Sequence, residues 1–177
     1  MEQTYKVVII GESGVGKTTW LERYMTGYFR KNYIATMGCE VHPIICRTNQ
    51  GTTTLNVWDC AGQEKYKGLD EGYYIGAKLV IIMFDLGSRV TLNNVKTYIN
   101  KVQNVTQNIP IVLWGNKIDC KELQVTKEMV EKLYPDFPCL YTSAKLQLDF
   151  DKLILDVLNR LNQLNEMNRF EQVDFVK

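Results

Sequence analysis

The residues best suited to chemistry lie near the start of the chain, in the segment Gly11-Glu12-Ser13-Gly14-Val15-Gly16-Lys17-Thr18-Thr19. An apolar run at residues 7–10 precedes this segment, which predicts a buried strand that ends in a glycine-rich turn and continues as a helix. The backbone N–H groups of such a turn converge on one point, and the helix dipole adds positive potential there. We therefore predict that residues 12–19 bind a phosphate group, the alternative being a loop that is merely flexible.

Side chains in and near this loop could bind the phosphates and the metal ion of a nucleoside triphosphate and could take part in its hydrolysis. Lys17 is placed to reach the β- and γ-phosphates, and the Thr18 hydroxyl to bind Mg²⁺. Asp59 ends a predicted neighbouring strand and is expected to hold the same ion through water, although an aspartate there can also be a simple cap. The Gly62 N–H could bond to the γ-phosphate, and the Gln63 amide could orient a water molecule for in-line attack. Lys17 and Gln63 are the predicted catalytic residues.

Two later segments carry groups that can recognise a base. In Asn116-Lys117-Ile118-Asp119, the carboxylate of Asp119 can accept hydrogen bonds from N1–H and the exocyclic amine of guanine. Adenine lacks that pair of donors, so a buried Asp119 would be left unsatisfied by it. In Ser143-Ala144-Lys145, which follows the last predicted strand, the Ala144 N–H could bond to the guanine O6. Together these residues predict a guanine-nucleotide site.

Apolar runs alternate with amphipathic segments along the chain, which predicts an α/β fold. Residues 40–58 form a predicted antiparallel hairpin with its turn at 49–51, and Pro43 assigns the first of its strands to the exposed edge. We expect a single P-loop NTPase domain at residues 1–165, followed by a tail at 166–177. Its sheet should be six-stranded and mostly parallel, with one antiparallel edge strand and helices on both faces. Ligands of such sheets bind at the carboxyl ends of the strands, where all these motifs lie.

The composition excludes several classes of protein. The 177 residues include 21 Lys and Arg against 20 Asp and Glu, so we expect no direct nucleic-acid partner. The five cysteines show no metal-binding spacing, which indicates reduced thiols in the cytoplasm and/or nucleus. The apolar run at 79–84 is too short to cross a bilayer. Because residue 2 is Glu2 and no cysteine lies near residue 177, we expect a soluble protein without a lipid anchor.

The motifs, in this order and at these spacings, resemble the Ras superfamily of small GTPases over residues 5–160, and within it the Ran branch. The Ran-like stretches are Ala35-Thr36-Met37-Gly38-Cys39-Glu40-Val41-His42-Pro43, Asn56-Val57-Trp58-Asp59-Cys60-Ala61-Gly62-Gln63-Glu64-Lys65-Tyr66, Gly72-Tyr73-Tyr74-Ile75, Ile81-Ile82-Met83-Phe84-Asp85 and Ile109-Pro110-Ile111-Val112-Leu113-Trp114-Gly115-Asn116-Lys117.

The resemblance implies a molecular switch that binds GTP or GDP with Mg²⁺ and slowly hydrolyses GTP. Residues 28–38 would be switch I and residues 60–76 switch II. Thr36 would bind Mg²⁺ and the γ-phosphate in the GTP state only, while Phe29 and the stem of Lys117 would pack on opposite faces of the guanine. The implied partners of this expected monomer are a GTPase-activating protein (GAP), an exchange factor and importin-type receptors of nucleocytoplasmic transport.

Some residues depart from the Ran pattern. Ser13 stands where that branch has glycine, as in Rab proteins, and Asp70 stands where it has arginine. Residues 131–134 and 174–177 lack its basic cluster and acidic terminus. The alternatives are a Rab-like GTPase without a lipid anchor, a nucleotide-binding interaction module or decoy with little hydrolysis, and an ATP-dependent P-loop kinase. His42, the only histidine, is expected to make a surface or partner contact rather than to act as a base.

Overall fold

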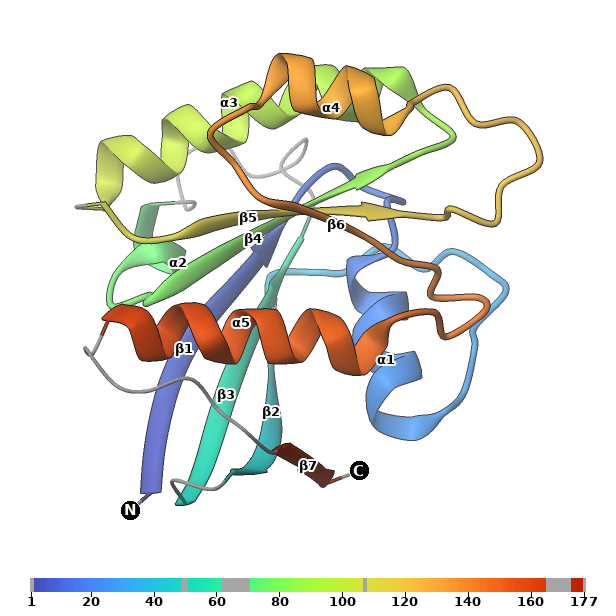
Figure 1. The fold of residues 1–177 in the computed structure, drawn as a ribbon. Coiled ribbons are helices and arrows are strands. Elements are labelled where there is room, and N and C mark those ends of the chain that lie inside the picture. The colour runs from blue at the N-terminus through green and yellow to red at the C-terminus, as the bar shows by residue number, and fades with distance from the viewer. Residues whose placement is uncertain (1, 49–50, 62–70, 107, 165–172, 177) are drawn as a thin grey trace.

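The computed structural model describes residues 2–48, 51–61, 71–106, 108–164 and 173–176, which form a sheet covered by helices on both faces (Figure 1). The strands are β1 (Glu2–Ile10), β2 (Cys39–Thr48), β3 (Gly51–Cys60), β4 (Leu79–Asp85), β5 (Ile111–Asn116), β6 (Cys139–Tyr141) and β7 (Val173–Val176). Their order across the sheet is β6-β5-β4-β1-β3-β2-β7. All neighbours pair in parallel except β2, which is antiparallel to both β3 and β7.

The predicted six-stranded, mostly parallel sheet with an antiparallel β2 is confirmed, but β2 is not the outermost strand along its whole length. β7 pairs with residues 45–48 of β2 and adds a seventh strand, which places Arg47 directly opposite Asp174. Opposite charges at facing positions favour such a pairing. Among the described residues, no strand pairs with the outer side of β2 beside Pro43, so the missing N–H of this proline breaks no ladder there.

Five helices complete the layers: α1 (Lys17–Thr26), α2 (Glu71–Tyr74), α3 (Arg89–Val105), α4 (Lys127–Leu133) and α5 (Phe150–Leu164). In Figure 1, α3 and α4 lie on one face of the sheet, and α1 and α5 lie on the other. The helix α1 ends at Thr26, and Gly27 follows it with a φ of 72°, a left-handed conformation that suits glycine. The short helix α2 was not predicted.

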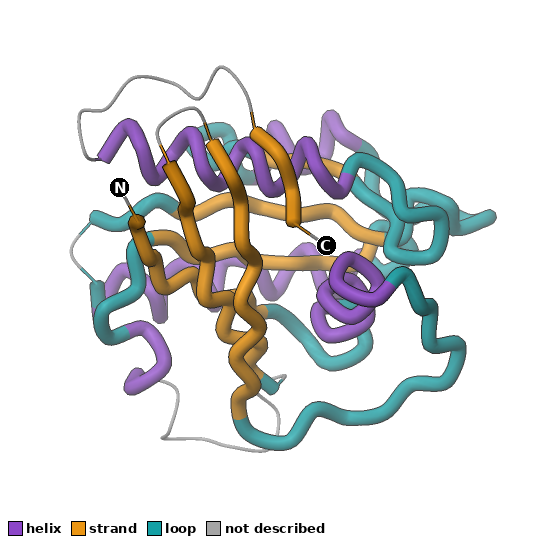
Figure 2. The backbone as a smooth tube through the Cα atoms, turned by 90° about the horizontal axis from the view of Figure 1, so that it is seen from below, coloured by secondary structure: helices purple, strands orange, loops and turns teal. Residues whose placement is uncertain are grey.

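Residues 27–38, between α1 and β2, contain no helix or strand and run along the outside of the molecule (Figure 2). The segment expected from the resemblance to be switch I, residues 28–38, lies within this loop. None of the helices in the described part of the chain has the length and apolar composition needed to span a bilayer.

An aromatic cluster joins α1 and α5 to the sheet. Trp20 on α1 is fully buried, and its ring centroid lies 4.7 Å from that of Trp114 on β5 and 4.4 Å from that of Phe150 on α5. The Trp20 Nε1–H donates to Thr142 Oγ1 at 3.2 Å, whereas Trp114 Nε1 has no partner within the described residues. The two buried indoles therefore differ in hydrogen bonding rather than in burial.

We expect Trp20→Phe to lower the free energy of unfolding by about 1–2 kcal/mol, because it removes a hydrogen bond and leaves a small void. Trp114→Phe is the matched control: it removes similar volume but no hydrogen bond within the described residues, so it should cost about 1 kcal/mol less. The measurement is the urea midpoint of each variant at an unchanged m-value. Equal midpoints would show that the Thr142 contact contributes nothing.

Candidate functional site

A pocket of about 370 Å³ opens where the loops after β1, β5 and β6 meet the loop between α1 and β2. This volume falls within the range of small-molecule sites. The predicted site residues that line it are Ser13, Gly14, Gly16, Lys17, Thr18, Thr19, Phe29, Thr36, Asn116, Lys117, Asp119, Ala144 and Lys145. Four predicted site residues are not among the lining residues: Glu12, Val15, Asp59 and Ser143. Two more, Gly62 and Gln63, lie outside the described residues.

The loop after β1 wraps closely around the ammonium group of Lys17. Lys17 Nζ donates to the carbonyl oxygens of Gly11 at 2.8 Å and Glu12 at 2.9 Å. Gly11 and Gly16 have φ angles of 144° and 103°, which side chains rarely adopt. A Cβ atom on Gly11 would lie 2.1 Å from the Met83 carbonyl oxygen, so larger residues are excluded there. The loop can therefore present N–H groups and one ammonium to an anion.

A cluster of oxygen atoms lies beside the first turn of α1. Thr18 Oγ1 donates to Asp59 Oδ2 at 2.5 Å and lies 2.6 Å from Thr36 Oγ1. Asp59 is fully buried, and its Oδ1 has no hydrogen-bond partner within the described residues. Burial raises the pKa of this carboxyl, while the Thr18 bond and Lys17 oppose the shift. Two hydroxyls and a carboxylate with a free oxygen fit a hard cation such as Mg²⁺.

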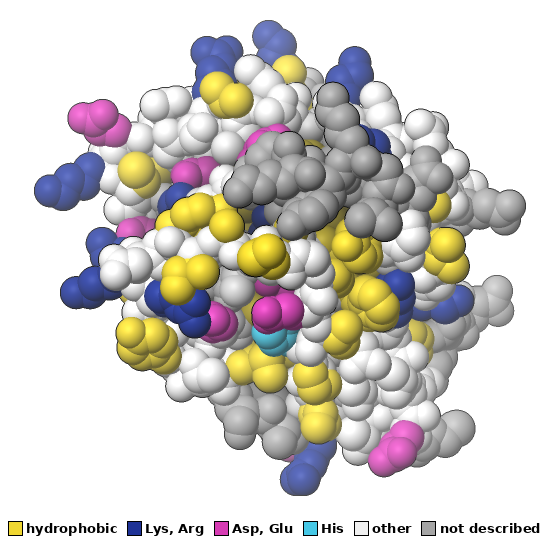
Figure 3. Space-filling view, turned by 180° about the vertical axis from the view of Figure 1, so that it is seen from behind, with side chains coloured by type: hydrophobic (Ala, Val, Ile, Leu, Met, Phe, Trp, Pro, Cys, Tyr) yellow, Lys and Arg dark blue, Asp and Glu magenta, His cyan; other side chains and the backbone are white. Residues whose placement is uncertain are grey.

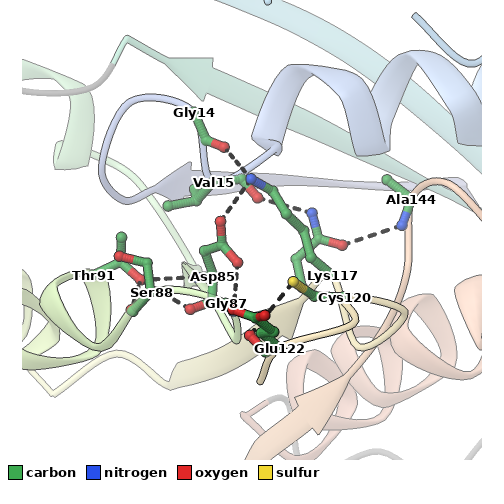
Figure 4. Close-up of polar contacts among 11 residues, drawn as sticks. Gly14, Val15, Asp85, Gly87, Ser88, Thr91, Lys117, Cys120, Glu122 and Ala144 are labelled. Atoms are coloured by element: carbon green, nitrogen blue, oxygen red, sulfur yellow. Dashed lines mark hydrogen bonds and ion pairs between the residues drawn. The ribbon is translucent and has the colours of Figure 1, made fainter. Parts of the chain in front are cut away.

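Asn116 and Lys117 tie the far end of the pocket to the loop after β1. Asn116 Nδ2 donates to the Val15 carbonyl at 2.8 Å, and its Oδ1 accepts from the Ala144 N–H at 3.1 Å. Lys117 Nζ donates to the Gly14 carbonyl at 2.8 Å and to Asp85 Oδ2 at 2.6 Å (Figure 4). The predicted bond from Ala144 to a guanine O6 would therefore have to share its N–H with Asn116.

Asp119 lines the pocket, and each of its two carboxylate oxygens has a neighbouring side chain. Its Oδ1 accepts from Ser143 Oγ at 2.5 Å, and its Oδ2 lies 3.7 Å from Lys145 Nζ. Ser143 is fully buried and in turn accepts from the Leu146 N–H at 3.0 Å. Ser143 therefore orients Asp119 by a direct contact, which is a more specific role than the binding predicted for it.

A sequence model of the Ras family matches residues 6–163. The chain belongs to the Ras family. The match begins within β1 and ends within α5, and so includes every described residue that lines the pocket. Ras-family proteins are small GTPase switches that bind GTP and GDP, typically with Mg²⁺, and are served by GAPs and exchange factors.

Within this Ras-family domain, the Glu12 side chain is turned away from the pocket. Glu12 Oε1 accepts from Asn94 Nδ2 at 3.0 Å and from the Tyr98 hydroxyl at 3.1 Å, both on α3. Only the backbone of Glu12 is left for the predicted phosphate contact. His42 is not among the lining residues either, and its Nε2 lies 3.6 Å from Glu40 Oε2.

Sequence reasoning missed several residues of the Ras-family pocket. The unpredicted lining residues are Glu22, Arg30, Lys31, Asn32, Tyr33, Ile34 and Cys120. Arg30 Nη2 donates to Glu22 Oε1 at 2.8 Å, which ties the loop after α1 back to that helix. Five of these residues directly follow Phe29, in the segment Arg30-Lys31-Asn32-Tyr33-Ile34. Their position next to a predicted contact is the feature of the sequence that could have identified them.

Proposed function

We propose that this Ras-family protein is a guanine-nucleotide switch whose pocket holds GTP or GDP with Mg²⁺. The observation that carries the proposal is that Asp119 and the glycine-rich loop line one pocket of about 370 Å³. The carboxylate can accept from guanine while the loop N–H groups and Lys17 bind phosphates. Phe29 and Lys117 also line the pocket, as expected of groups that pack on the base.

In the proposed switch, Thr36 senses the γ-phosphate. Its hydroxyl lies 2.6 Å from that of Thr18, so residues 28–38 are already drawn toward the cation site. Bound Mg²⁺ would be held by Thr18, Thr36 and, through water, Asp59, and would supply positive charge to the phosphates. Loss of the γ-phosphate would remove the bonds that Thr36 and Gly62 make to it, and partners would read the released segments.

The proposed hydrolysis uses Gln63 and Lys17. Gln63 orients the attacking water, and Lys17 stabilises charge on the transferred phosphoryl group. Unassisted turnover should be slow, and a GAP would supply the missing charge stabilisation. An interaction module without hydrolysis would bind the same nucleotides, so binding alone does not separate the two functions.

Binding and single-turnover measurements test the proposal in sequence. Fluorescent GDP should bind with Mg²⁺ present, GTP should displace it, and ATP should fail to do so; displacement by ATP would favour a P-loop kinase instead. Phosphate released from preloaded GTP would then support the GTPase, whereas tight binding without release, with or without an added GAP, would support the interaction module.

Gln63→Leu should leave GTP affinity within about twofold of the parent and slow single-turnover hydrolysis by roughly tenfold or more, because leucine cannot orient the water. Gln103→Leu, an exposed position on α3 outside the lining residues, is the matched control and should hydrolyse GTP at the parental rate. If Gln63→Leu also matched the parent, Gln63 would have no part in the mechanism.

We further propose a Ran-like role in which importin-type receptors bind the GTP state. An apolar surface beside switch I supports a partner there, because Met37, Val41 and Ile45 are 79%, 47% and 41% exposed. Figure 3 shows such side chains gathered around the only histidine, His42. Purified importin-type receptors should be retained by the immobilised protein with a GTP analogue and not with GDP. Equal retention in both states would show that the nucleotide does not control binding of these receptors. No retention in either state would show that they do not bind this protein. Either result would contradict the Ran-like role.

A further inference from the structure

Two cysteines face each other where β2 and β3 reach the nucleotide-binding end of the sheet. Cys39, the first residue of β2, pairs in register with Cys60, the last residue of β3. Both are free thiols, and their Sγ atoms lie 3.2 Å apart. The Ras-family activity described above uses neither residue.

The backbone geometry at this position suits a covalent link. The Ala61 N–H donates to the Gly38 carbonyl at 2.9 Å, so the next pair along the ladder, Cys39 and Cys60, is a non-hydrogen-bonded pair. Such pairs bring their Cα atoms to about 4.5 Å, within the range that disulfides span. Rotation of the two side chains is therefore enough to bring the sulfur atoms into bonding distance.

The two thiols differ in ways that assign them separate roles. Cys39 is partly exposed, whereas Cys60 is only 3% exposed and belongs to the apolar cluster on the α3 face. The hydrogen bond from Cys60 lowers the pKa of Cys39 and Lys6 adds to this effect, while partial burial, Asp59 and Glu40 oppose it. A thiolate is the form that attacks peroxides. Cys39 is thus the accessible nucleophile, and Cys60 is the buried thiol adjacent to it.

The other three cysteines, Cys46, Cys120 and Cys139, lack this arrangement. Burial raises the pKa of Cys46 to about 12 and that of Cys139 to about 11, which keeps both protonated. Cys120 is exposed, and its Sγ makes a hydrogen bond to the Glu122 carbonyl at 3.6 Å. Among the described residues, only Cys39 and Cys60 lie within bonding reach of each other.

We propose that Cys39 and Cys60 form a reversible modification site, an intramolecular disulfide made by hydrogen peroxide. The Cys39 thiol loses its proton and the resulting thiolate attacks the peroxide, so that an S–O bond forms and the O–O bond breaks; the departing hydroxide takes up that proton and becomes water. The Cys60 sulfur then attacks the sulfenic sulfur of Cys39; the S–S bond forms, the S–O bond breaks, and the Cys60 proton leaves with the hydroxide as water. Two thiols are oxidised and one peroxide is reduced to two waters.

This link would fasten together the ends of two segments that matter for the nucleotide site. Cys39 follows Gly38, which ends the loop that carries Thr36, and Cys60 lies between Asp59 and Ala61. The proposal does not depend on the proposed function, because the bond is detected by mass whether or not a nucleotide is bound.

The test is peptide mapping of the full-length protein after mild peroxide treatment and alkylation of the remaining thiols. The expected product has lost the mass of two hydrogen atoms, contains a peptide linking Cys39 to Cys60, and returns to the parental mass with dithiothreitol. Cys120→Ser, which removes an exposed thiol elsewhere, should give the same link. Absence of the link while Cys120 becomes oxidised, or random pairing among the cysteines, would overturn the proposal.

Single variants test the assigned order of attack. With Cys60→Ser, a dimedone probe should trap a sulfenic acid on Cys39. With Cys39→Ser, labelling of Cys60 should be at least roughly tenfold lower, because that thiol is buried and the probe cannot reach it. Equal labelling of the two cysteines would contradict these roles, and the parental peptide map decides the matter if either variant fails to fold.

Discussion

Replacing Asp119 with Asn should lower the affinity for GTP and GDP by roughly 10²- to 10⁴-fold, the largest change expected of any single substitution in this protein. The carboxylate is expected to accept two hydrogen bonds from guanine, and each bond to a charged group contributes about 1.5–3 kcal/mol. Asparagine keeps one acceptor and replaces the other with a donor. Xanthine carries an oxygen where guanine carries its amine, so the variant should bind xanthosine nucleotides better than the parent does.

The measurement is competition between fluorescent GDP and unlabelled GTP, XTP or ATP. Asp136→Asn makes the same chemical change at an exposed position outside the pocket lining and should leave the ranking of nucleotides unchanged. Because Asp119 Oδ1 accepts from Ser143, the thermal midpoint without nucleotide should be recorded as well. A folded Asp119→Asn variant that still prefers guanine strongly would show that the base is recognised by other residues.

The second large effect is expected at Thr18. Thr18→Ala removes the hydroxyl that contacts both Asp59 and Thr36, at 2.5 Å and 2.6 Å. We expect Mg²⁺-GTP affinity to fall by roughly 30- to 150-fold, which corresponds to about 2–3 kcal/mol for a lost charged hydrogen bond and metal ligand. Affinity for GDP should fall less, because Thr36 is proposed to join the site only with GTP.

Thr18→Ser keeps the hydroxyl and is the control for the methyl group, so its affinity should stay close to that of the parent. Both variants should be titrated with GTP and GDP, with Mg²⁺ and with an excess of chelator. In the parent, chelation should weaken GTP binding strongly, and in Thr18→Ala this Mg²⁺ dependence should be much smaller. An alanine variant that retains the full dependence would remove Thr18 from the proposed metal site.

Much of the phosphate end of the pocket could be predicted from sequence because its signals are local. An apolar strand, three closely spaced glycines and a helix follow one another directly, and each is recognised within a few residues. Asp59 lies far from Thr18 in the chain, yet their approach also followed from the predicted strands. β3 pairs in parallel with β1, and that register sets Asp59 beside Ile9, just before the glycine-rich loop.

Side-chain direction at the base end was harder to predict, because it depends on which element packs nearby. The motif places Glu12 and Ser143 near the ligand, but Glu12 bonds to α3 and Ser143 bonds to Asp119. The competing partner in each case belongs to a distant segment. The strand β7 was missed for the same reason, because it pairs with β2, which is distant in the sequence. The alternation in its residues, Val173-Asp174-Phe175-Val176, is nevertheless typical of a strand.

The facing cysteines could not be predicted, because the hairpin register in the structure differs by one residue from the predicted one. In an antiparallel hairpin the residue numbers of facing partners have a constant sum, and the predicted turn at 49–51 would set Thr48 opposite Thr52 and Cys39 opposite Ala61. In the structure Thr48 faces Gly51, and this register sets Cys39 opposite Cys60. A shift of one residue in the turn therefore decides whether the two cysteines face each other.

The strand β7 also has a consequence for the behaviour of the protein in concentrated solution. Without it, the outer side of β2 from Ile45 to Thr48 would present unpaired N–H and C=O groups beside an exposed isoleucine. Such a border is a template for strands from other molecules and a starting point for domain swapping or fibrous aggregation. With β7 in place, the outermost strand on this side is only four residues long, and a very short edge strand is a poor template for the strands of neighbouring copies.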